Sequence, residues 1–287
     1  MTAQTVFTVA GLTLREAARR RVLWALAALT LALLTLSAWG FSKLAGIEFE
    51  GSALTSGEER LIASQVLNLV MFGLSLIAAL GTAFLAGPTL AGEIESGTAL
   101  SILARPIRRS AVLLGKWLGL VAFGSGFVAV AGLAQFLIVR VTVGYWPPHP
   151  VEGLALLAAQ TTVLLTLGLL LATLISPMAS GVVAVGLFGA TWIAGVVGGI
   201  GDALDNESLA RVGSVSRMLL PTDGLWRGAM HALQDPIALA QFGGPALEGG
   251  FPFLSPAGLT FAYLGWVVVW VALLLGLAAV TFLRRDL

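Results

Sequence analysis

The sequence predicts an all-α integral membrane protein with six transmembrane helices. Hydrophobic residues make up 57% of its 287 residues and charged residues only 11%, whereas a soluble domain carries about 25% charged residues. So few polar side chains cannot cover a globule in water, and lipid must therefore cover much of the chain. Six apolar stretches of about 20 residues are long enough to cross a bilayer, and the alternation typical of β-barrel strands is absent.

The six stretches follow one another along the whole chain. Each is expected to be a helix, because backbone groups inside a bilayer must be hydrogen-bonded within their own segment. The first stretch is longer than the apolar core of a cleaved signal peptide, which has about 7–15 residues, so we expect it to be retained. The stretches are residues 22–39, 64–91, 118–138, 153–175, 181–200 and 257–283.

The positions of the basic residues predict that both termini are cytoplasmic. With the N-terminus inside, ten of the 16 Lys and Arg residues lie on the inner side and six on the outer side. An excess of basic residues in the shorter segments marks the cytoplasmic side. The inner set is Arg15, Arg19, Arg20, Arg21, Arg105, Arg108, Arg109, Lys116, Arg284 and Arg285, and the outer set is Lys43, Arg60, Arg140, Arg211, Arg217 and Arg227.

Two segments outside the stretches are expected to be structured at the membrane surface. Residues 5–21 combine apolar residues with a basic end and predict an interfacial helix; a plain cytoplasmic extension of the first helix is the alternative. Residues 201–256 predict an outer loop that lies against the outer membrane face. One short helix in it would follow the N-cap Asn206, and a second would start at Pro221, with one buried face and one wet face.

Charged residues are rare inside the predicted helices, which limits the functions open to the chain. Residues 153–201 contain none. Proton- or sodium-coupled transporters commonly carry ionisable side chains inside the membrane, so an ion-coupled secondary transporter or channel is the weaker alternative. It stays open because backbone carbonyls at broken helices can bind sodium. His149 and His231 lie in outer loops and cysteine is absent, so neither a catalytic site nor a metal site is expected.

No segment fits a nucleotide-binding loop. The nearest fragment to the Walker A pattern GxxxxGK[ST] is Gly115-Lys116-Trp117, in which Ser110 replaces the first glycine and Trp117 replaces the final Ser or Thr. The chain is therefore expected to hold no cofactor and to hydrolyse no ATP itself. Any ATP and magnesium would be bound by a partner chain.

Residues 92–110, between the second and third stretches, are the most informative segment. They predict a short helix in the membrane surface, a break at Arg105-Pro106 and the start of a new helix. Leu100 and Leu103 would supply an apolar knob for a partner's groove, inside a charged rim. The alternative is an ordinary cytoplasmic loop whose charges only fix the topology.

This segment resembles the permeases of ABC-2-type transporters. It reads E-x-E-x-G-T, then L-x-x-P-I-x-R, then L-x-G-K-x-x-G. Residues 220–227 and 282–286 are also similar to this family, and the single-span-plus-loop layout is similar to the permease of nitrous oxide reductase maturation. The residues that carry the pattern are Glu93, Glu95, Gly97, Thr98, Pro106, Ile107, Arg109, Leu113, Gly115, Lys116 and Gly119.

The resemblance implies a multi-pass protein of the inner (cytoplasmic) membrane that works with partners. Two six-helix permeases, here expected as a homodimer, would surround a central path, and two separate ABC ATPase subunits would dock beneath them. An extracytoplasmic accessory protein would fit the same assembly, whereas nucleic acid would not. The residues expected to couple the chain to the ATPase are Glu93, Glu95, Gly97, Thr98, Leu100, Leu103, Pro106 and Arg109.

The fifth stretch is rich in glycine and predicts a close packing seam. Gly195 and Gly199 have the GxxxG spacing that lets helix backbones approach each other. The seam would lie either between two permease copies or within one bundle. Gly115 and Gly119 share this spacing, but at a helix end. The sequence does not identify the cargo. The uncharged interior favours an apolar or amphiphilic molecule over a hydrophilic one. A force-transmitting role without a conducted cargo stays open.

Overall fold

A computed structural model describes residues 2–44, 48–49, 52–53, 56–95, 109–242, 253–255 and 257–284. Within these ranges nearly every residue is helical, apart from short turns and a two-stranded hairpin in which Glu48 pairs with Ala53. The elements are α1 (Thr2–Ala17), α2 (Arg21–Leu44), β1 (Glu48–Phe49), β2 (Ser52–Ala53), α3 (Ser56–Glu95), α5 (Arg109–Val143), α6 (Pro150–Leu174), α7 (Pro177–Ala203), α8 (Glu207–Leu219), α9 (Thr222–Leu233), α10 (Pro236–Phe242) and α12 (Phe261–Arg284).

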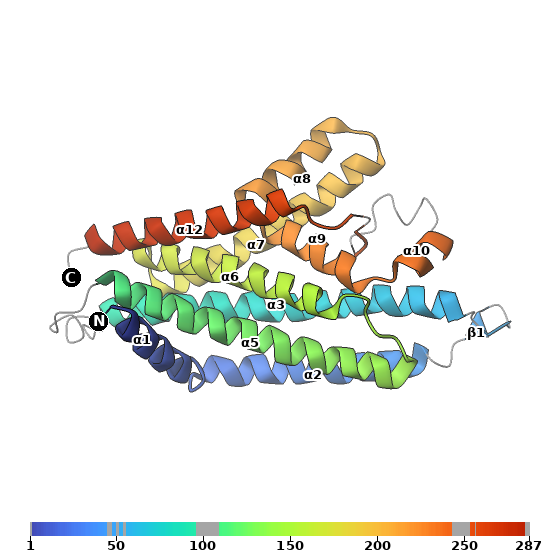
Figure 1. The fold of residues 1–287 in the computed structure, drawn as a ribbon, viewed down its shortest axis with the longest axis horizontal. Coiled ribbons are helices and arrows are strands. Elements are labelled where there is room, and N and C mark those ends of the chain that lie inside the picture. The colour runs from blue at the N-terminus through green and yellow to red at the C-terminus, as the bar shows by residue number, and fades with distance from the viewer. Residues whose placement is uncertain are drawn as a thin grey trace.

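Six helices in the described ranges are long and apolar enough to cross a membrane: α2, α3, α5, α6, α7 and α12. They correspond one by one to the six predicted stretches, so the predicted fold class is confirmed. Figure 1 shows them as an elongated bundle, with α1 and the end of α12 at one end and the β1–β2 hairpin at the other. We call these the terminal end and the hairpin end. An even number of crossings explains why both termini lie at one end; the cytoplasmic location of that end stays a prediction.

The core of the bundle forms around α3 and α6. Both helices are mostly buried along their apolar windows, whereas α2 and α12 expose most of theirs. Leu67 and Met71 of α3 and Val163 of α6 are almost fully buried, together with Trp226 of α9. The outer helices instead expose large apolar side chains, as expected where lipid is the solvent.

Two of the helices extend furthest beyond their apolar stretches. α3 has 40 residues and α5 has 35, while the predicted stretches end where the sequence becomes polar. Lys116, in the third turn of α5, is accommodated although it is only 4% exposed, because its Nζ donates a hydrogen bond to the carbonyl of Thr89 on α3 at 2.6 Å. The polar first turns of α5 therefore pack on α3.

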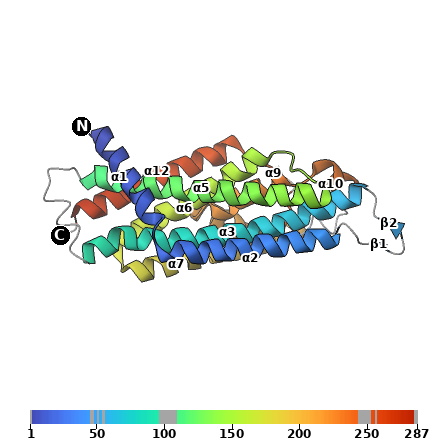
Figure 2. The same cartoon turned by 90° about the horizontal axis from the view of Figure 1, so that it is seen from below.

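The N-terminal helix α1 lies across α5, as the turned view in Figure 2 shows. A Cβ atom added at Gly115 would lie 2.6 Å from Cβ of Val9, and one at Gly119 would lie 2.6 Å from the carbonyl of Ala10. α1 therefore packs directly on the backbone of α5 at Gly115 and Gly119. The helix spans Thr2–Ala17, which is shifted towards the N-terminus from the predicted 5–21, and its interfacial position in a membrane stays a prediction.

The segment after α7 contains the two predicted short helices and one more. Asn206 is the N-cap of α8, since its Oδ1 accepts from the amides of Ser208 and Leu209. α9 begins at Thr222, one residue after the predicted Pro221, but the expectation that one of its faces is wet was wrong. Ten of its 12 residues are buried, because α9 packs between α3, α6 and α7. α10, which was not predicted, follows it.

Candidate functional site

The predicted ATPase-coupling residues are only partly described. Glu93 and Glu95 belong to the last turns of α3, and Arg109 is the first residue of α5. Gly97, Thr98, Leu100, Leu103 and Pro106 lie outside the described residues, so their docking role stays a prediction. The two stems of this segment are in contact, however, since the bond from Lys116 to the Thr89 carbonyl joins α5 to α3 about two turns before α3 ends.

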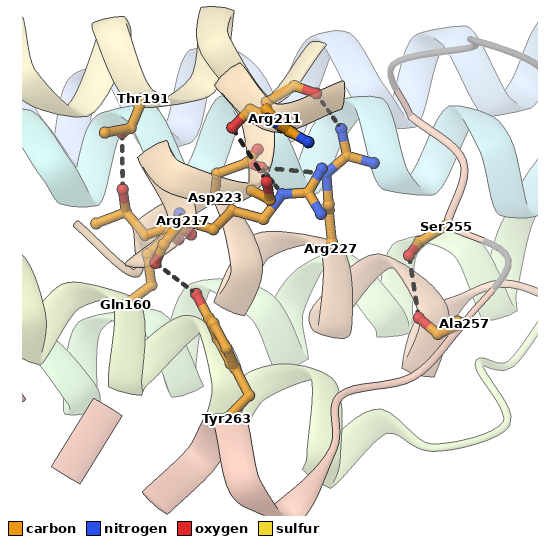
Figure 3. Close-up of polar contacts among 12 residues, drawn as sticks. Gln160, Thr191, Arg211, Arg217, Asp223, Arg227, Ser255, Ala257 and Tyr263 are labelled. Atoms are coloured by element: carbon orange, nitrogen blue, oxygen red, sulfur yellow. Dashed lines mark hydrogen bonds and ion pairs between the residues drawn. The ribbon is translucent and has the colours of Figure 1, made fainter. Parts of the chain in front are cut away.

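A cluster of buried polar contacts lies where α8 and α9 meet (Figure 3). Asp223, near the start of α9, is 3% exposed. Its Oδ2 accepts from Nε of Arg217 at 3.2 Å and from Nε of Arg227 at 3.1 Å. Nη2 of Arg227 also donates to the carbonyl of Gly195 on α7 at 2.6 Å. We call Arg217, Asp223 and Arg227 the ionic triad; it joins three helices.

The glycine at position 195 is a requirement of this geometry. A Cβ atom there would lie 2.2 Å from Oδ2 of Asp223, a distance no real Cβ contact shows. A Cβ atom at Gly199 would lie 3.4 Å from Nη2 of Arg227, which is an ordinary contact. Both glycines of the predicted seam thus face α9 of the same chain. The idea that they also face a second permease copy stays a prediction.

Burial and ion pairing act in opposite directions on the triad. Burial raises the pKa of the Asp223 carboxyl above its ordinary value, and the charges of Arg227 and Arg217 oppose that shift. Two guanidinium groups share one carboxylate, so the cluster has a formal charge of +1 when all three groups are ionised. Both arginines keep partial exposure, at 26% for Arg217 and 20% for Arg227, which lets solvent reach the excess charge.

Three aromatic residues of α12 hold the end of α8. Tyr263 Oη donates to the carbonyl of Arg217 at 3.1 Å, Trp266 Nε1 to that of Met218 at 3.1 Å, and Trp270 Nε1 to that of Leu219 at 2.8 Å. The last carbonyls of a helix have no partner within the helix. A stripe with i, i+3 and i+7 spacing on α12 therefore satisfies consecutive carbonyls of α8, which fixes the position of the turn between α8 and α9.

A second set of polar contacts fixes the other side of this turn. Thr222 Oγ1 lies 3.0 Å from Oγ1 of Thr191 on α7, and Gln160 Nε2 of α6 donates to the Thr222 carbonyl at 3.1 Å. Ser75 Oγ of α3 donates in turn to Oε1 of Gln160 at 2.7 Å. The turn between α8 and α9 is therefore bonded to α3, α6, α7 and α12. It can move only if these long helices move with it or the bonds break.

The triad could not be predicted from the sequence. Residues 220–227 were notable only for their similarity to a family segment, and Arg217 and Arg227 were counted only among the basic residues of the outer side. One signal was present: two arginines lie six residues before and four residues after a single aspartate, among mostly apolar neighbours. Nothing in that spacing shows that Gly195, some 28 positions earlier, completes the cluster.

Comparison with known proteins identifies the family. The family model described as "ABC-2 family transporter protein" matches residues 7–287. The comparison with curated proteins gives no match for this chain. A family match over nearly the whole length agrees with the six apolar helices in the described ranges and makes this a multi-pass membrane protein. The chain thus belongs to the ABC-2 family of transporter proteins, as a membrane-spanning transport permease.

Proposed function

We propose that this chain is the permease subunit of an ABC exporter, driven by two copies of a separate ATPase that binds the ATP and magnesium. Residues 92–110 would dock in the ATPase, and two copies of the permease would form the translocation path. The observation that carries this proposal is the arrangement at the terminal end. There the stems of the segment are joined by the Lys116–Thr89 bond, and α1 packs on α5 beside it.

This arrangement suits the transmission of force from an ATPase. A displacement applied between α3 and α5 would move both helices together, since neither stem can shift without breaking a buried hydrogen bond. Further along α3, Ser75 is hydrogen-bonded to Gln160 of α6, and Gln160 is hydrogen-bonded to the carbonyl of Thr222 at the start of α9. A rigid-body shift of packed helices is a common way to transmit such a signal. ATP binding to the docked ATPase would in this way displace the turn between α8 and α9.

One observation favours the alternative, an ion-coupled secondary transporter. Asp223 is a buried carboxylate, and in ion-coupled transporters such acids often carry protons. Its two arginine partners stabilise the charged form, however, so it is better suited to hold helices than to exchange protons. We therefore assign it a structural role and keep ATP as the energy source.

The two functions differ in what drives transport. We expect proteoliposomes that contain the permease and its ATPase to move cargo only with ATP, and a pH step alone to have no effect. The purified permease alone should show no ATPase activity. Transport driven by a proton gradient without ATP would contradict the permease function and favour the alternative.

A further inference from the structure

A groove of about 640 Å³ runs between α7 and α8, with α6 and α12 at its inner end. Its volume lies within the roughly 300–1,000 Å³ of small-molecule sites. Most of its lining is apolar, including Leu187, Val215 and Trp270. The described residues that line it are Leu167, Leu187, Ala190, Thr191, Ala194, Ser208, Arg211, Val212, Val215, Ser216, Leu219, Leu220 and Trp270.

The charged part of the lining lies at one end of the groove, and towards the other end the lining is mostly apolar, with the hydroxyls of Thr191 and Ser216 among the apolar side chains. The positions that α8 contributes, from Ser208 to Leu219, follow one face of the helix, which makes this wall about 16 Å long at 1.5 Å per residue. The first two turns of α8, which follow the turn after α7, carry Ser208 and Arg211. Its last turn carries Leu219, next to Trp270 of α12 and Leu167 of α6. One end can therefore hold a polar headgroup and the other a hydrocarbon chain.

With α12 spanning the bilayer, the apolar end would lie at the depth of the lipid hydrocarbon. Trp270 is about 14 Å along α12 from Phe261, in a helix of 24 residues that would span the membrane. This is close to the middle of a hydrocarbon core of about 30 Å. Leu187 is likewise near the middle of α7. A hydrocarbon chain could enter from the bilayer without crossing water.

The charged side chain that lines the polar end is positive. Arg211 is the one charged residue among the described residues that line the groove. It pairs with Glu207 at 3.3 Å, but both side chains are largely exposed, so solvent screens the pair and leaves it weak. A guanidinium has five N–H donors, and this pair occupies only one of its nitrogens. An anionic headgroup therefore complements this end better than a cationic one.

We propose that the groove binds an anionic amphiphile from the bilayer, with its headgroup on Arg211 and its hydrocarbon chain against Val215, Leu219 and Trp270. Such an amphiphile is the class of cargo that this permease would transport. The cargo assignment rests on the proposed permease function, whereas binding itself does not. The groove adjoins the turn between α8 and α9, so a bound chain would contact the element that the long helices hold in place.

The test uses the purified permease in nanodiscs of phosphatidylcholine, with dibromostearic acid as the anionic probe. Bromine quenches tryptophan fluorescence on contact, and Trp270 would report on the groove. The chain has eight tryptophans, so the signal of interest is the saturable quenching that is lost in Trp270→Phe. We expect Val215→Phe, which fills the groove, to weaken this binding about tenfold. The matched variant Val268→Phe, on an exposed face of α12 outside the groove, should leave it unchanged.

The charge is tested separately. Arg211→Gln should weaken binding of dibromostearic acid about fivefold, as expected for an exposed charge contact, and should leave binding of the neutral dibromostearyl alcohol unchanged. Arg140→Gln on α5 is the control, because Arg140 is also exposed but lies outside the groove. Equal effects of Arg211→Gln on the acid and the alcohol would overturn the anionic headgroup.

Three results would overturn the proposal as a whole. If Trp270→Phe shows the same saturable quenching as wild type, or if Val215→Phe and Val268→Phe behave alike, the probe only partitions into lipid. If the probe does not bind and Val215→Cys forms a disulfide between two copies, the groove is filled by a second permease. Retention of the ATPase is measured on the same samples: loss of probe binding with the ATPase retained refutes only the groove, and failure to bind any ATPase refutes the permease function.

Discussion

At the scale of single residues, the ionic triad depends on a glycine at position 195 as much as on its three charged side chains. Gly195 has no Cβ, and the carboxylate of Asp223 occupies the space a Cβ would need. That close approach lets one carboxylate accept from two arginines while Arg227 also reaches the backbone of α7. Buried charges are tolerated only when they are paired and hydrogen-bonded, and these contacts meet that condition.

We predict that Gly195→Ala destabilises the protein by about 1–3 kcal/mol, the usual cost of overpacking. The added Cβ would push Asp223 away from Arg217 and Arg227. Gly189→Ala is the matched control on the same helix, because no atom lies within 4 Å of a Cβ there. Thermal unfolding in detergent should show a lower midpoint for Gly195→Ala only. Equal midpoints for the two variants would show that α9 does not depend on this contact.

The triad should also behave as a coupled unit. Asp223→Asn leaves two guanidinium groups without their carboxylate and should cost about 3 kcal/mol, at the lower end for a broken buried pair because both arginines are partly exposed. Arg227→Gln should then cost less in the Asp223→Asn background than in wild type. Glu207→Gln, which breaks only the exposed pair with Arg211, should change stability by less than about 0.5 kcal/mol. Additive costs in the double variant would argue against the triad.

At the scale of elements, α1 is the clearest case of a helix held by a partner distant in sequence. It packs on α5 where Gly115 and Gly119 leave room for its backbone. Thr13 of α1 is 4% exposed at this contact. α1 is therefore fixed beside the stems of residues 92–110, and its detachment should be measurable without any activity assay.

We predict that Gly115→Leu releases α1 from α5. A side chain there would meet Val9 and the backbone carbonyl of Val6 within 2.8 Å, and backbone cannot yield as a flexible side chain can. Because the chain has no cysteine, Thr13→Cys can report the release through its rate of maleimide labelling. The rate should rise with Gly115→Leu and stay unchanged with Gly126→Leu, since Gly126 of α5 has open space around it. An unchanged rate in both variants would mean that α1 remains docked.

At the scale of the whole molecule, length and hydropathy were enough to predict the six membrane helices but not their ends. α5, for example, begins at Arg109, well before its apolar stretch, because Lys116 in its polar first turns is hydrogen-bonded to the carbonyl of Thr89 on α3. The buried state of α9 could not be predicted from its own sequence. Asp223 and Thr222 are buried only because α6, α7 and α8 supply their partners.

The two glycine pairs also show that a sequence pattern does not identify the partner of a helix. Spacing identified Gly195 and Gly199 as packing positions, but not the element that packs there. Gly115 and Gly119 were given less weight because they lie near a helix end. In the structure they contact α1, which has 16 residues and is not one of the six candidate membrane-spanning helices. Spacing predicts close approach; which element approaches depends on the whole fold.

The orientation in the membrane is a prediction for the whole molecule. Since ten of 16 basic residues lie on the side predicted to be inner, we expect Ser214→Cys on α8 to react with an impermeant maleimide added outside cells, and Ser101→Cys to react only after the membrane is opened. Ser214 is exposed in the structure. The opposite labelling pattern would reverse the orientation and place residues 92–110 away from any cytoplasmic ATPase.

The proposed function requires residues 92–110 to dock in a separate ATPase. If Leu100 and Leu103 form a buried knob, Leu100→Ala with Leu103→Ala should cost a few kcal/mol of binding, as truncated interface anchors do. Membrane insertion should stay normal, because the hydrophobicity of α3 and α5 is unchanged. Glu95→Lys should weaken the complex mainly at low salt, since salt screens exposed charges.

The deciding measurement is the amount of ATPase retained per permease after purification in detergent, at low and at high salt. The account predicts that wild type retains the ATPase, that the double alanine variant loses most of it at both salt concentrations, and that the variant still inserts at normal levels. Full retention of the ATPase by the double alanine variant, together with normal ATP-driven transport, would show that residues 92–110 are not the docking element.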